Sequence, residues 1–284
     1  MADEKADETC IEIYPIRSFI RCHLKNLMSH LYLNQIKVKF IAAVFGVIYS
    51  HFAMAAPEEI QVYMDEFAEK GKVGLDLHTI YTSSTFNNQS QTPRHQLRLT
   101  PELSYGLNDQ FEVAGYFLTN KAAAGNAQTD GIKLRMRYRP IVPSDDSSWY
   151  TAVNVELGKL SRRFNSDGSN GEIKGILTWK NAAWVAGLNL NIDRPLKRVS
   201  TAPTTYELDG KLAYKLDSDL QFGVEHYAFL GAVRGSIPGF LPNRITFLVS
   251  DFKIGKWDIN FGVGRASGAV LDKVIIKAII GVPI

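Results

Sequence analysis

The clearest chemical pattern in the sequence is a row of basic residues spaced two apart. In the segment GIKLRMRYRP, residues 131–140, apolar residues alternate with Lys133, Arg135, Arg137 and Arg139. A period of two puts alternate side chains on opposite faces of a β-strand, so the four cations would share one face. Such a row can bind or orient an anion. Charged residues with the same parity occur on other segments, at Arg98, Glu207, Asp209 and Glu225.

Residues suited to catalysis form no recognisable constellation. Beyond residue 55 the histidines are His78, His95 and His226, and no GxSxG, HExxH, P-loop or GxGxxG pattern accompanies them. The two cysteines, Cys10 and Cys22, are too few for a Cys-rich zinc site. We therefore predict no enzyme, no catalytic residue, no metal site and no cofactor. His226 falls on an otherwise apolar stripe, and the sequence offers no explanation for it.

The elements that would position these charges are β-strands, because a period of two dominates the chain past Gly71. Most of the alternating segments are about ten residues long, the length that a tilted strand needs to cross a bilayer. Soluble strands are more often about five or six residues long. The pattern predicts twelve strands, at residues 73–82, 94–105, 109–118, 130–140, 149–159, 171–180, 183–193, 205–216, 219–229, 244–254, 256–264 and 271–281.

The connections between these strands alternate in length. Very short ones fall at residues 106–108, 180–181, 217–218 and 255–256, whereas long polar ones fall at residues 83–93, 119–129, 161–170, 194–204 and 230–243. Short turns at one end and long loops at the other are typical of outer-membrane barrels. We predict an all-β fold, a transmembrane antiparallel up-and-down barrel of about twelve strands, in preference to a soluble sandwich.

Large aromatic residues agree with this interpretation. They flank the short turns and share the parity of the apolar residues, which predicts a lipid-facing ring at the periplasmic interface. The ring comprises Tyr105, Tyr138, Trp149, Trp179, Trp184, Tyr214 and Trp257.

The first residues have the pattern of a targeting sequence and not that of barrel strands. The apolar run at residues 40–56 follows Lys37 and Lys39 and ends in small residues, which favours a secretory signal cleaved after Ala55 over a transmembrane anchor. Residues 1–27 fit no signal layout, so translation could start at Met28 instead of Met1. We thus divide the chain into residues 1–55, a lead segment at residues 56–72 and a barrel at residues 73–284.

The lead segment has a helix-like apolar stripe formed by Ile60, Tyr63, Met64 and Phe67. Two interpretations stay open, namely a periplasmic or lumenal plug and an ordered lead that packs at the barrel mouth. For the whole chain, a mean hydropathy of −0.09 excludes a protein with many transmembrane helices. A net charge of +3 is too small to indicate nucleic acid as a partner.

Two stretches carry a family resemblance. Residues 58–82, EEIQVYMDEFAEKGKVGLDLHTIYT, and residues 98–118, RLTPELSYGLNDQFEVAGYFL, resemble proteobacterial outer-membrane proteins of the MetA-pathway of phenol degradation family. The resemblance implies a β-barrel that takes up small, aromatic molecules, and it transfers no active-site residues. One departure is the end of the chain, Val282-Pro283-Ile284, where such barrels usually have an aromatic residue.

These observations lead to one preferred function and two alternatives. We predict a porin-like channel in the outer membrane of a Gram-negative bacterium, with that membrane's lipid, a small aromatic or anionic solute and the barrel-assembly machinery as partners. The alternatives are a closed barrel with a structural or adhesive role through its long loops, and a barrel enzyme acting on envelope lipid. The predicted pore-lining residues are Arg98, Lys133, Arg135, Arg137, Arg139, Glu207, Asp209 and Glu225. These charges would either form a constriction that orients the solute or pair with one another and fill the lumen.

Overall fold

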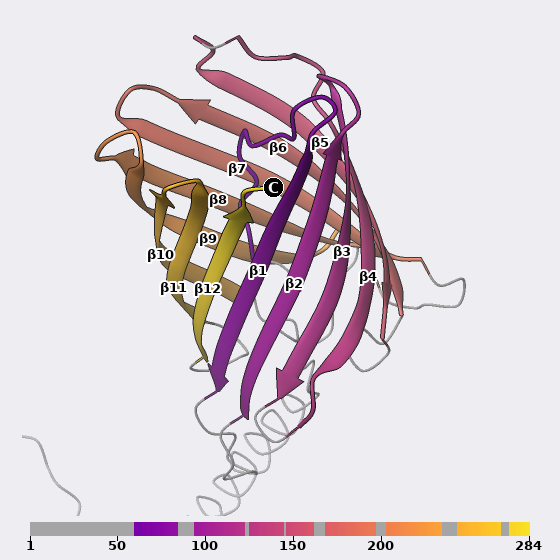
Figure 1. Cartoon of the computed structure of the whole chain (residues 1–284). Coiled ribbons are helices and arrows are strands. Elements are labelled where there is room, and N and C mark those ends of the chain that lie inside the picture. Colours follow the sequence, from indigo (N-terminus) through magenta and orange to yellow (C-terminus); the bar gives the residue numbers. More distant parts are fainter. Residues whose placement is uncertain are drawn as a thin grey trace, which may run out of the picture. The chain divides into compact units, whose positions relative to one another are not determined.

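The computed structural model is a closed barrel of antiparallel strands (Figure 1). It describes residues 60–84, 94–122, 125–144, 146–161, 168–196, 203–234, 243–267 and 273–284. The signal sequence, its cleavage after Ala55 and the candidate starts at Met1 and Met28 lie outside the described residues. Within these ranges, no helix is long and apolar enough to span a membrane.

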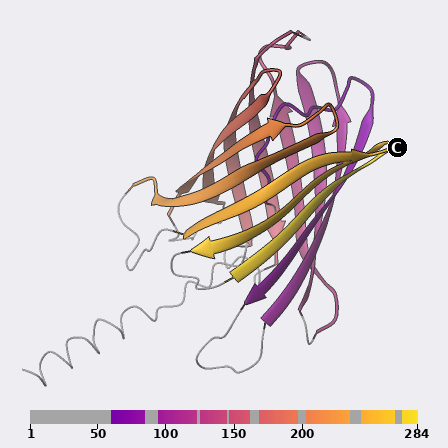
Figure 2. The ribbon, with the colours of Figure 1, turned by 90° about the vertical axis from the view of Figure 1, so that its left-hand side faces the viewer.

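The strands follow one another around the barrel in chain order. β1 (Val73–Ser84) pairs with β12 (Lys273–Val282) and closes the ring, and Figure 2 shows these two strands side by side. The prediction of twelve strands is confirmed, with ends that differ by a few residues. The other strands are β2 (Arg94–Gly106), β3 (Phe111–Ala122), β4 (Gln128–Tyr138), β5 (Trp149–Leu160), β6 (Ser169–Lys180), β7 (Trp184–Pro195), β8 (Thr205–Lys215), β9 (Leu220–Ala232), β10 (Asn243–Ile254) and β11 (Trp257–Ser267).

The short turns are closed by their own polar side chains. Asn108 Oδ1 accepts hydrogen bonds from the backbone N–H groups of Gln110 at 2.8 Å and Phe111 at 2.9 Å. Asn181 Oδ1 does the same for Ala183 and Trp184. Asparagine favours such turns because its side chain replaces a backbone acceptor. We call this rim the short-turn end and the opposite rim the loop end.

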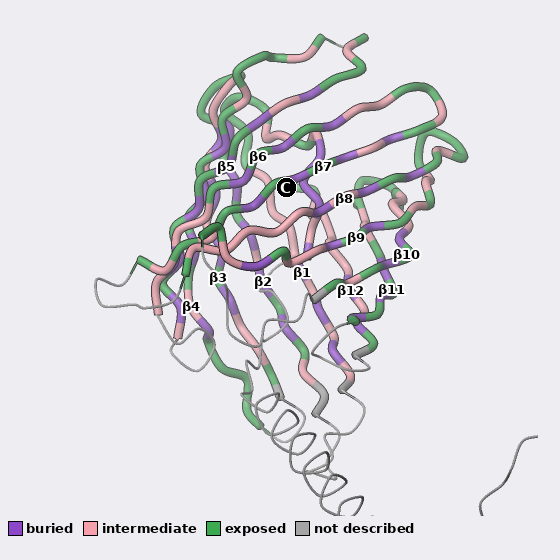
Figure 3. The backbone as a smooth tube through the Cα atoms, turned by 180° about the vertical axis from the view of Figure 1, so that it is seen from behind, coloured by how far each residue is buried: buried purple, intermediate pink, exposed green. Residues whose placement is uncertain are grey.

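Burial alternates along the strands and is inverted relative to a soluble protein. Outward-facing leucines are widely exposed, with Leu134 at 62% and Leu248 at 72%, whereas inward-facing Glu156 and Lys277 are each 1% exposed. Figure 3 shows the same alternation as exposed and buried segments along each strand. The barrel therefore has a polar interior and an apolar outer face, which suits an apolar surrounding rather than water.

The lead segment, residues 60–70, is extended, so the predicted helix is wrong. Ile60, Val62 and Met64 alternate with Tyr63 as in a strand, and all four are buried. The Tyr63 backbone N–H donates to Asn189 Oδ1 at 2.7 Å, and Asn189 Nδ2 donates to the Tyr63 carbonyl at 2.9 Å. The backbone thus satisfies its hydrogen bonds with side chains of the barrel wall, and a helix would have used them internally. In Figure 1 the lead is the indigo trace that runs into β1.

Candidate channel lumen

The basic row predicted on residues 131–140 faces the interior. Lys133, Arg135 and Arg137 are each at most 5% exposed, and Arg98 on β2 is 3% exposed. Arg139 lies one residue beyond the end of β4, half-buried at the short-turn end. Its guanidinium lies 4.0 Å from the centre of the Phe67 ring in the lead. The row therefore leads from the middle of the wall to the short-turn rim.

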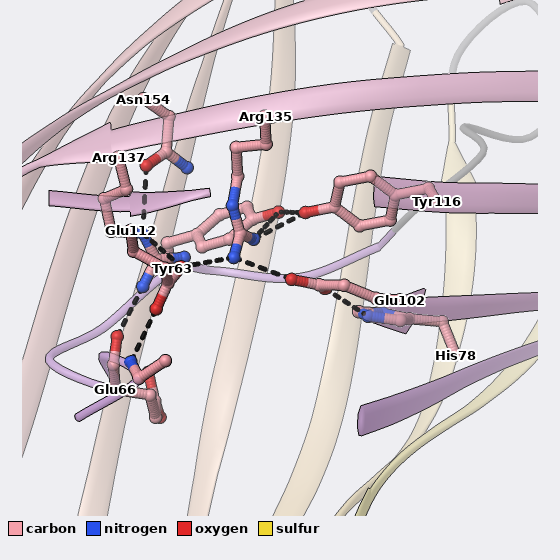
Figure 4. A network of polar contacts seen from close by, with 10 residues as sticks. Tyr63, Glu66, His78, Glu102, Glu112, Tyr116, Arg135, Arg137 and Asn154 are labelled. Carbon is pink, nitrogen blue, oxygen red and sulfur yellow. Dashed lines mark hydrogen bonds and ion pairs between the residues drawn. The ribbon is translucent and has the colours of Figure 1, made fainter. Parts of the chain in front are cut away.

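Arg135 is the centre of a network that joins four strands (Figure 4). Its Nη2 atom lies 2.7 Å from Glu102 Oε1 on β2 and also contacts Glu112 on β3. Glu102 in turn lies 3.0 Å from the Nε2 atom of His78 on β1. The two carboxylates balance the guanidinium, so this charge is neutralised in the folded protein rather than directed at open water.

Tyr63 of the lead occupies a cage of cations. Its ring centre lies 4.7 Å from the Arg137 guanidinium carbon, 5.3 Å from that of Arg135 and 4.3 Å from Lys174 Nζ. Each distance is within the range of a cation–π interaction. The phenol oxygen lies 2.9 Å from the Tyr116 hydroxyl and accepts a hydrogen bond from Arg135 Nη1 at 3.2 Å. The barrel wall therefore holds a phenol ring by both its face and its hydroxyl group.

Further polar contacts fasten the lead along its length. Arg137 donates to the Glu66 carbonyl and, through Nε, to Asn154 Oδ1 at 2.9 Å. The Ala68 N–H donates to Glu112 Oε2 at 2.5 Å. Lys277 Nζ donates to the Ile60 carbonyl at 3.1 Å from the other side of the barrel. The lead is thus attached to walls on both sides of the lumen, by contacts that involve no covalent bond.

The predicted acidic residues lie on another part of the wall. Glu225 on β9 is 1% exposed and pairs with Lys277 and with Lys211, the latter at 3.5 Å. Asp209 on β8 accepts from Asn191 Nδ2 at 2.6 Å, and Glu207 follows an irregularity in the β8–β9 register. The structure brings Lys133, Arg135 and Arg137 together on β4, and it brings Glu207 and Asp209 together on β8. The bases of β4 and the acids of β8 and β9 are separated around the ring by β5, β6 and β7.

Sequence reasoning missed three residues of the lumen. The pattern groups Tyr63 with a helical stripe, does not distinguish Tyr116, and shows Lys277 only as a charge that fits its strand poorly. Lys277 interrupts an apolar strand, and this isolated charge was the available signal for a buried partner. Its partner Glu225 lies 52 residues earlier, so only the strand arrangement reveals the pair.

A cavity of about 240 Å³ lies between the lead and the inner wall of β1–β4. Its lining includes Arg135, Arg137, Glu102 and Glu112 from the network, together with Asp76 and Lys72 near the short-turn end. Within the described ranges, no group of three or more histidine, cysteine or acidic side chains could hold a metal ion.

The aromatic residues predicted for the membrane interface all point outward beside the short turns. Trp149 is 60% exposed and Tyr214 is 45% exposed, and Trp184 packs edge-on against Tyr214 with ring centres 5.0 Å apart. Their contact with a membrane stays a prediction. His226 also faces outward, and its Nδ1 atom lies 2.9 Å from Thr246 Oγ1.

Comparisons with known proteins bear on the fold. No family model matches the chain, and no curated protein matches it. The COG4313 outer membrane channel from Pseudomonas putida F1 is similar in structure, with a TM-score of 0.53 and 11% identity over 78% of this chain and 100% of that chain. The KdgM porin has a TM-score of 0.50 and 13% identity over 74% of this chain and 99% of that chain.

These likenesses identify the class of fold. The protein has the closed antiparallel barrel seen in outer-membrane channel proteins. The resemblance to the MetA-pathway family is matched by no family model and stays a prediction.

Proposed function

We propose that the protein is an outer-membrane channel for a small aromatic or anionic solute, kept shut by its own lead segment. The proposal rests on one observation, the Tyr63 side chain inside its cage of Arg135, Arg137 and Lys174. A wall that holds a phenol by cations and hydroxyl contacts suits a solute of the same chemistry once the lead has moved away.

The contacts of the lead support a closed state that can open. Over residues 60–68 they are hydrogen bonds, ring contacts, an ion pair of Asp65 with Lys180, and apolar packing of Ile60, Val62 and Met64 against the wall, without a disulfide or a shared strand. Each hydrogen bond has a net free energy of about 1 kcal/mol and can be exchanged for one to water or solute. The apolar side chains contribute more, about 1.5–3 kcal/mol each, so we expect the closed state to predominate and openings to be rare. The apolar outer face and the polar interior support insertion in a membrane, with the short turns on the periplasmic side.

The test is planar-bilayer conductance of the refolded chain of residues 56–284, compared with residues 71–284, which lack the lead. We expect rare openings from the first and sustained steps from the second. Heat-modifiable migration on gels would establish that both are folded. A folded, lead-free barrel that conducts no ions would exclude the channel.

A matched pair of glycine substitutions examines the same point in the full chain. Gly187 on β7 faces Met64 of the lead so closely that a β-carbon would collide with the Met64 sulfur, whereas a β-carbon at Gly175 on β6 would meet nothing within 4 Å. Gly187→Leu should therefore raise the frequency of openings, and Gly175→Leu should leave it unchanged. If both variants opened equally often, the position of the lead would not control closure.

A closed barrel with a structural or adhesive role is the second candidate. The observation that favours it is the deep burial of lumen charges in pairs, such as Lys133 with Glu156 at 2.6 Å. Such pairs fill and stiffen an interior without a path for solute. A folded, lead-free barrel that conducts no ions would support this role.

A further inference from the structure

Basic side chains surround the loop end of the barrel on its outer face. We call this set the basic girdle. Each member is exposed and lies within three residues of the loop end of its strand. The members are Lys121 on β3, Lys159 on β5, Arg194 on β7, Arg244 on β10 and Arg265 on β11.

The strand register shows that the girdle faces outward. Lys121 is opposite Leu97, Lys159 is opposite Ile132 and Arg265 is opposite Val274. These three apolar partners are 43–48% exposed on the outer face. Directly opposite residues on neighbouring strands point to the same face, so the cations project outward as well. Arg194 and Arg244 share the parity of exposed Leu190 and Leu248 on their own strands.

The girdle has a single sign of charge. Among strand residues whose side chains are described and point outward, these five are the charged ones, so no acidic side chain occurs in this set. The lumen differs, because its clusters mix acids with bases. Basic residues gathered at one height, with no acid among the described outward-facing strand residues, form a field that attracts anions.

Two members of the girdle form a compact group with His226. Thr246 on β10 is opposite Arg265 on β11 and opposite His226 on β9, so the three share one row across the sheet. Arg244 precedes Thr246 by two residues and lies diagonally from Arg265. Diagonal neighbours of this kind are about 7–8 Å apart, which allows two guanidinium groups to bind one anion. His226 lies in the same row, where its Nδ1 atom contacts Thr246 Oγ1.

We propose that the basic girdle binds the phosphate groups of the glycolipid in the outer leaflet, with Arg244 and Arg265 as the principal site. The inference rests on the proposed outer-membrane location, with the loop end facing outward. At that height the apolar band of the barrel ends and lipid headgroups begin. Arginine suits this position because its planar fork binds phosphate oxygens in pairs.

Native mass spectrometry of the detergent-folded chain with bisphosphorylated lipid A tests the proposal. Arg244→Gln with Arg265→Gln should weaken binding by about tenfold or more, since each removes a charge-assisted contact. Lipid A without phosphates should bind the unchanged protein as weakly as bisphosphorylated lipid A binds the double variant. Inorganic phosphate at equal concentration should not displace the lipid, because it lacks the acyl chains that hold lipid A beside the barrel.

The matched control removes two cations from the other end, Lys253→Gln with Lys256→Gln, and should bind like the unchanged protein. Equal binding by the arginine variant, or equal binding of dephosphorylated lipid A, would overturn the proposal. The readout is independent of conductance. A barrel that binds lipid A but never conducts would contradict only the proposed channel function. A barrel that conducts but binds lipid A equally well with and without phosphates would contradict only the proposed role of the basic girdle.

Discussion

At the scale of single residues, Tyr63 is the side chain on which we expect the proposed closed state to depend most. Its ring contacts three cations, and its hydroxyl contacts Tyr116 and Arg135. Tyr63→Ala should cost the closed state about 2 kcal/mol, which raises the ratio of open to closed channels about thirtyfold. Tyr63→Phe keeps the ring and should raise the ratio only about fivefold. Single-channel recordings measure both, and the reverse order would contradict the cage.

Glu225 is the residue on which the stability of the interior depends. It pairs with Lys277 and Lys211 while nearly fully buried, so Glu225→Gln removes the carboxylate that contacts Lys277 and leaves Lys211 with Asp251. We expect a loss of about 3–5 kcal/mol in the free energy of unfolding, measured in urea with the barrel in detergent micelles. Asp258→Asn is the control, because Asp258 is 67% exposed in its pair with Lys253 and should change stability by about 0–1 kcal/mol. If the two variants lost equal stability, burial would not determine how much these ion pairs contribute to the free energy of unfolding.

The sequence predicted which charged residues face inward but not which ones meet. Parity along a strand places Arg135 and Glu225 inside regardless of the rest of the barrel. The pairing of Arg135 with Glu102 depends on the registers of β2, β3 and β4, which no local pattern contains. Tyr63 could not be placed at all, since its partners lie 53 to 126 residues away.

At the scale of elements, we expect β4 to determine the ion selectivity of the proposed channel. Neutralising Arg135 and Arg137 together, by Arg135→Gln with Arg137→Gln, should shift ion selectivity toward cations, because Glu102 and Glu112 then face the lumen without their main counter-charge. The reversal potential in a salt gradient, measured on the chain of residues 71–284, reports the shift. Lys159→Gln with Arg194→Gln removes as much charge from the outer face and should leave the potential unchanged. An unchanged potential in the β4 variant would remove these arginines from the path.

The strands could be predicted and the conformation of the lead could not, because a periodic pattern is recognisable only over a long enough segment. Each strand repeats an alternation long enough to be recognised, and each short turn contains an asparagine, aspartate or glycine suited to it. The lead is short, and Ile60, Tyr63, Met64 and Phe67 match a helical spacing. Ile60, Val62 and Met64 match a strand spacing equally well. The barrel wall favours the extended conformation over the helix, because Asn189 and Lys277 supply the hydrogen bonds that an extended backbone needs.

At the scale of the whole molecule, the outer face predicts how the barrel sits in a bilayer. The protein has four tryptophans, Trp149, Trp179, Trp184 and Trp257, and all flank short turns on the outer face. In vesicles, lipids brominated near the headgroup should therefore quench tryptophan fluorescence more strongly than lipids brominated near the bilayer centre. Urea-unfolded protein should show no such difference. Strongest quenching from the bilayer centre would contradict an interfacial ring.

The overall architecture was predictable because a barrel repeats one simple unit. Alternating short and long connections oriented the strands, and their even number brought both ends of the barrel segment to one rim. Closure itself needed the structure, since the pairing of β1 with β12 joins residues such as Leu75 and Val282 that are far apart in sequence.

That closing pair also constrains the order of assembly. β1 waits with one unpaired edge until β12, the last strand of the chain, has been made. The lead is joined directly to β1 and lies inside the finished ring. Contacts across so long a stretch of chain form slowly. For the proposed channel, the assembled barrel with its lead in the lumen is therefore the closed state, and opening is a separate, later step.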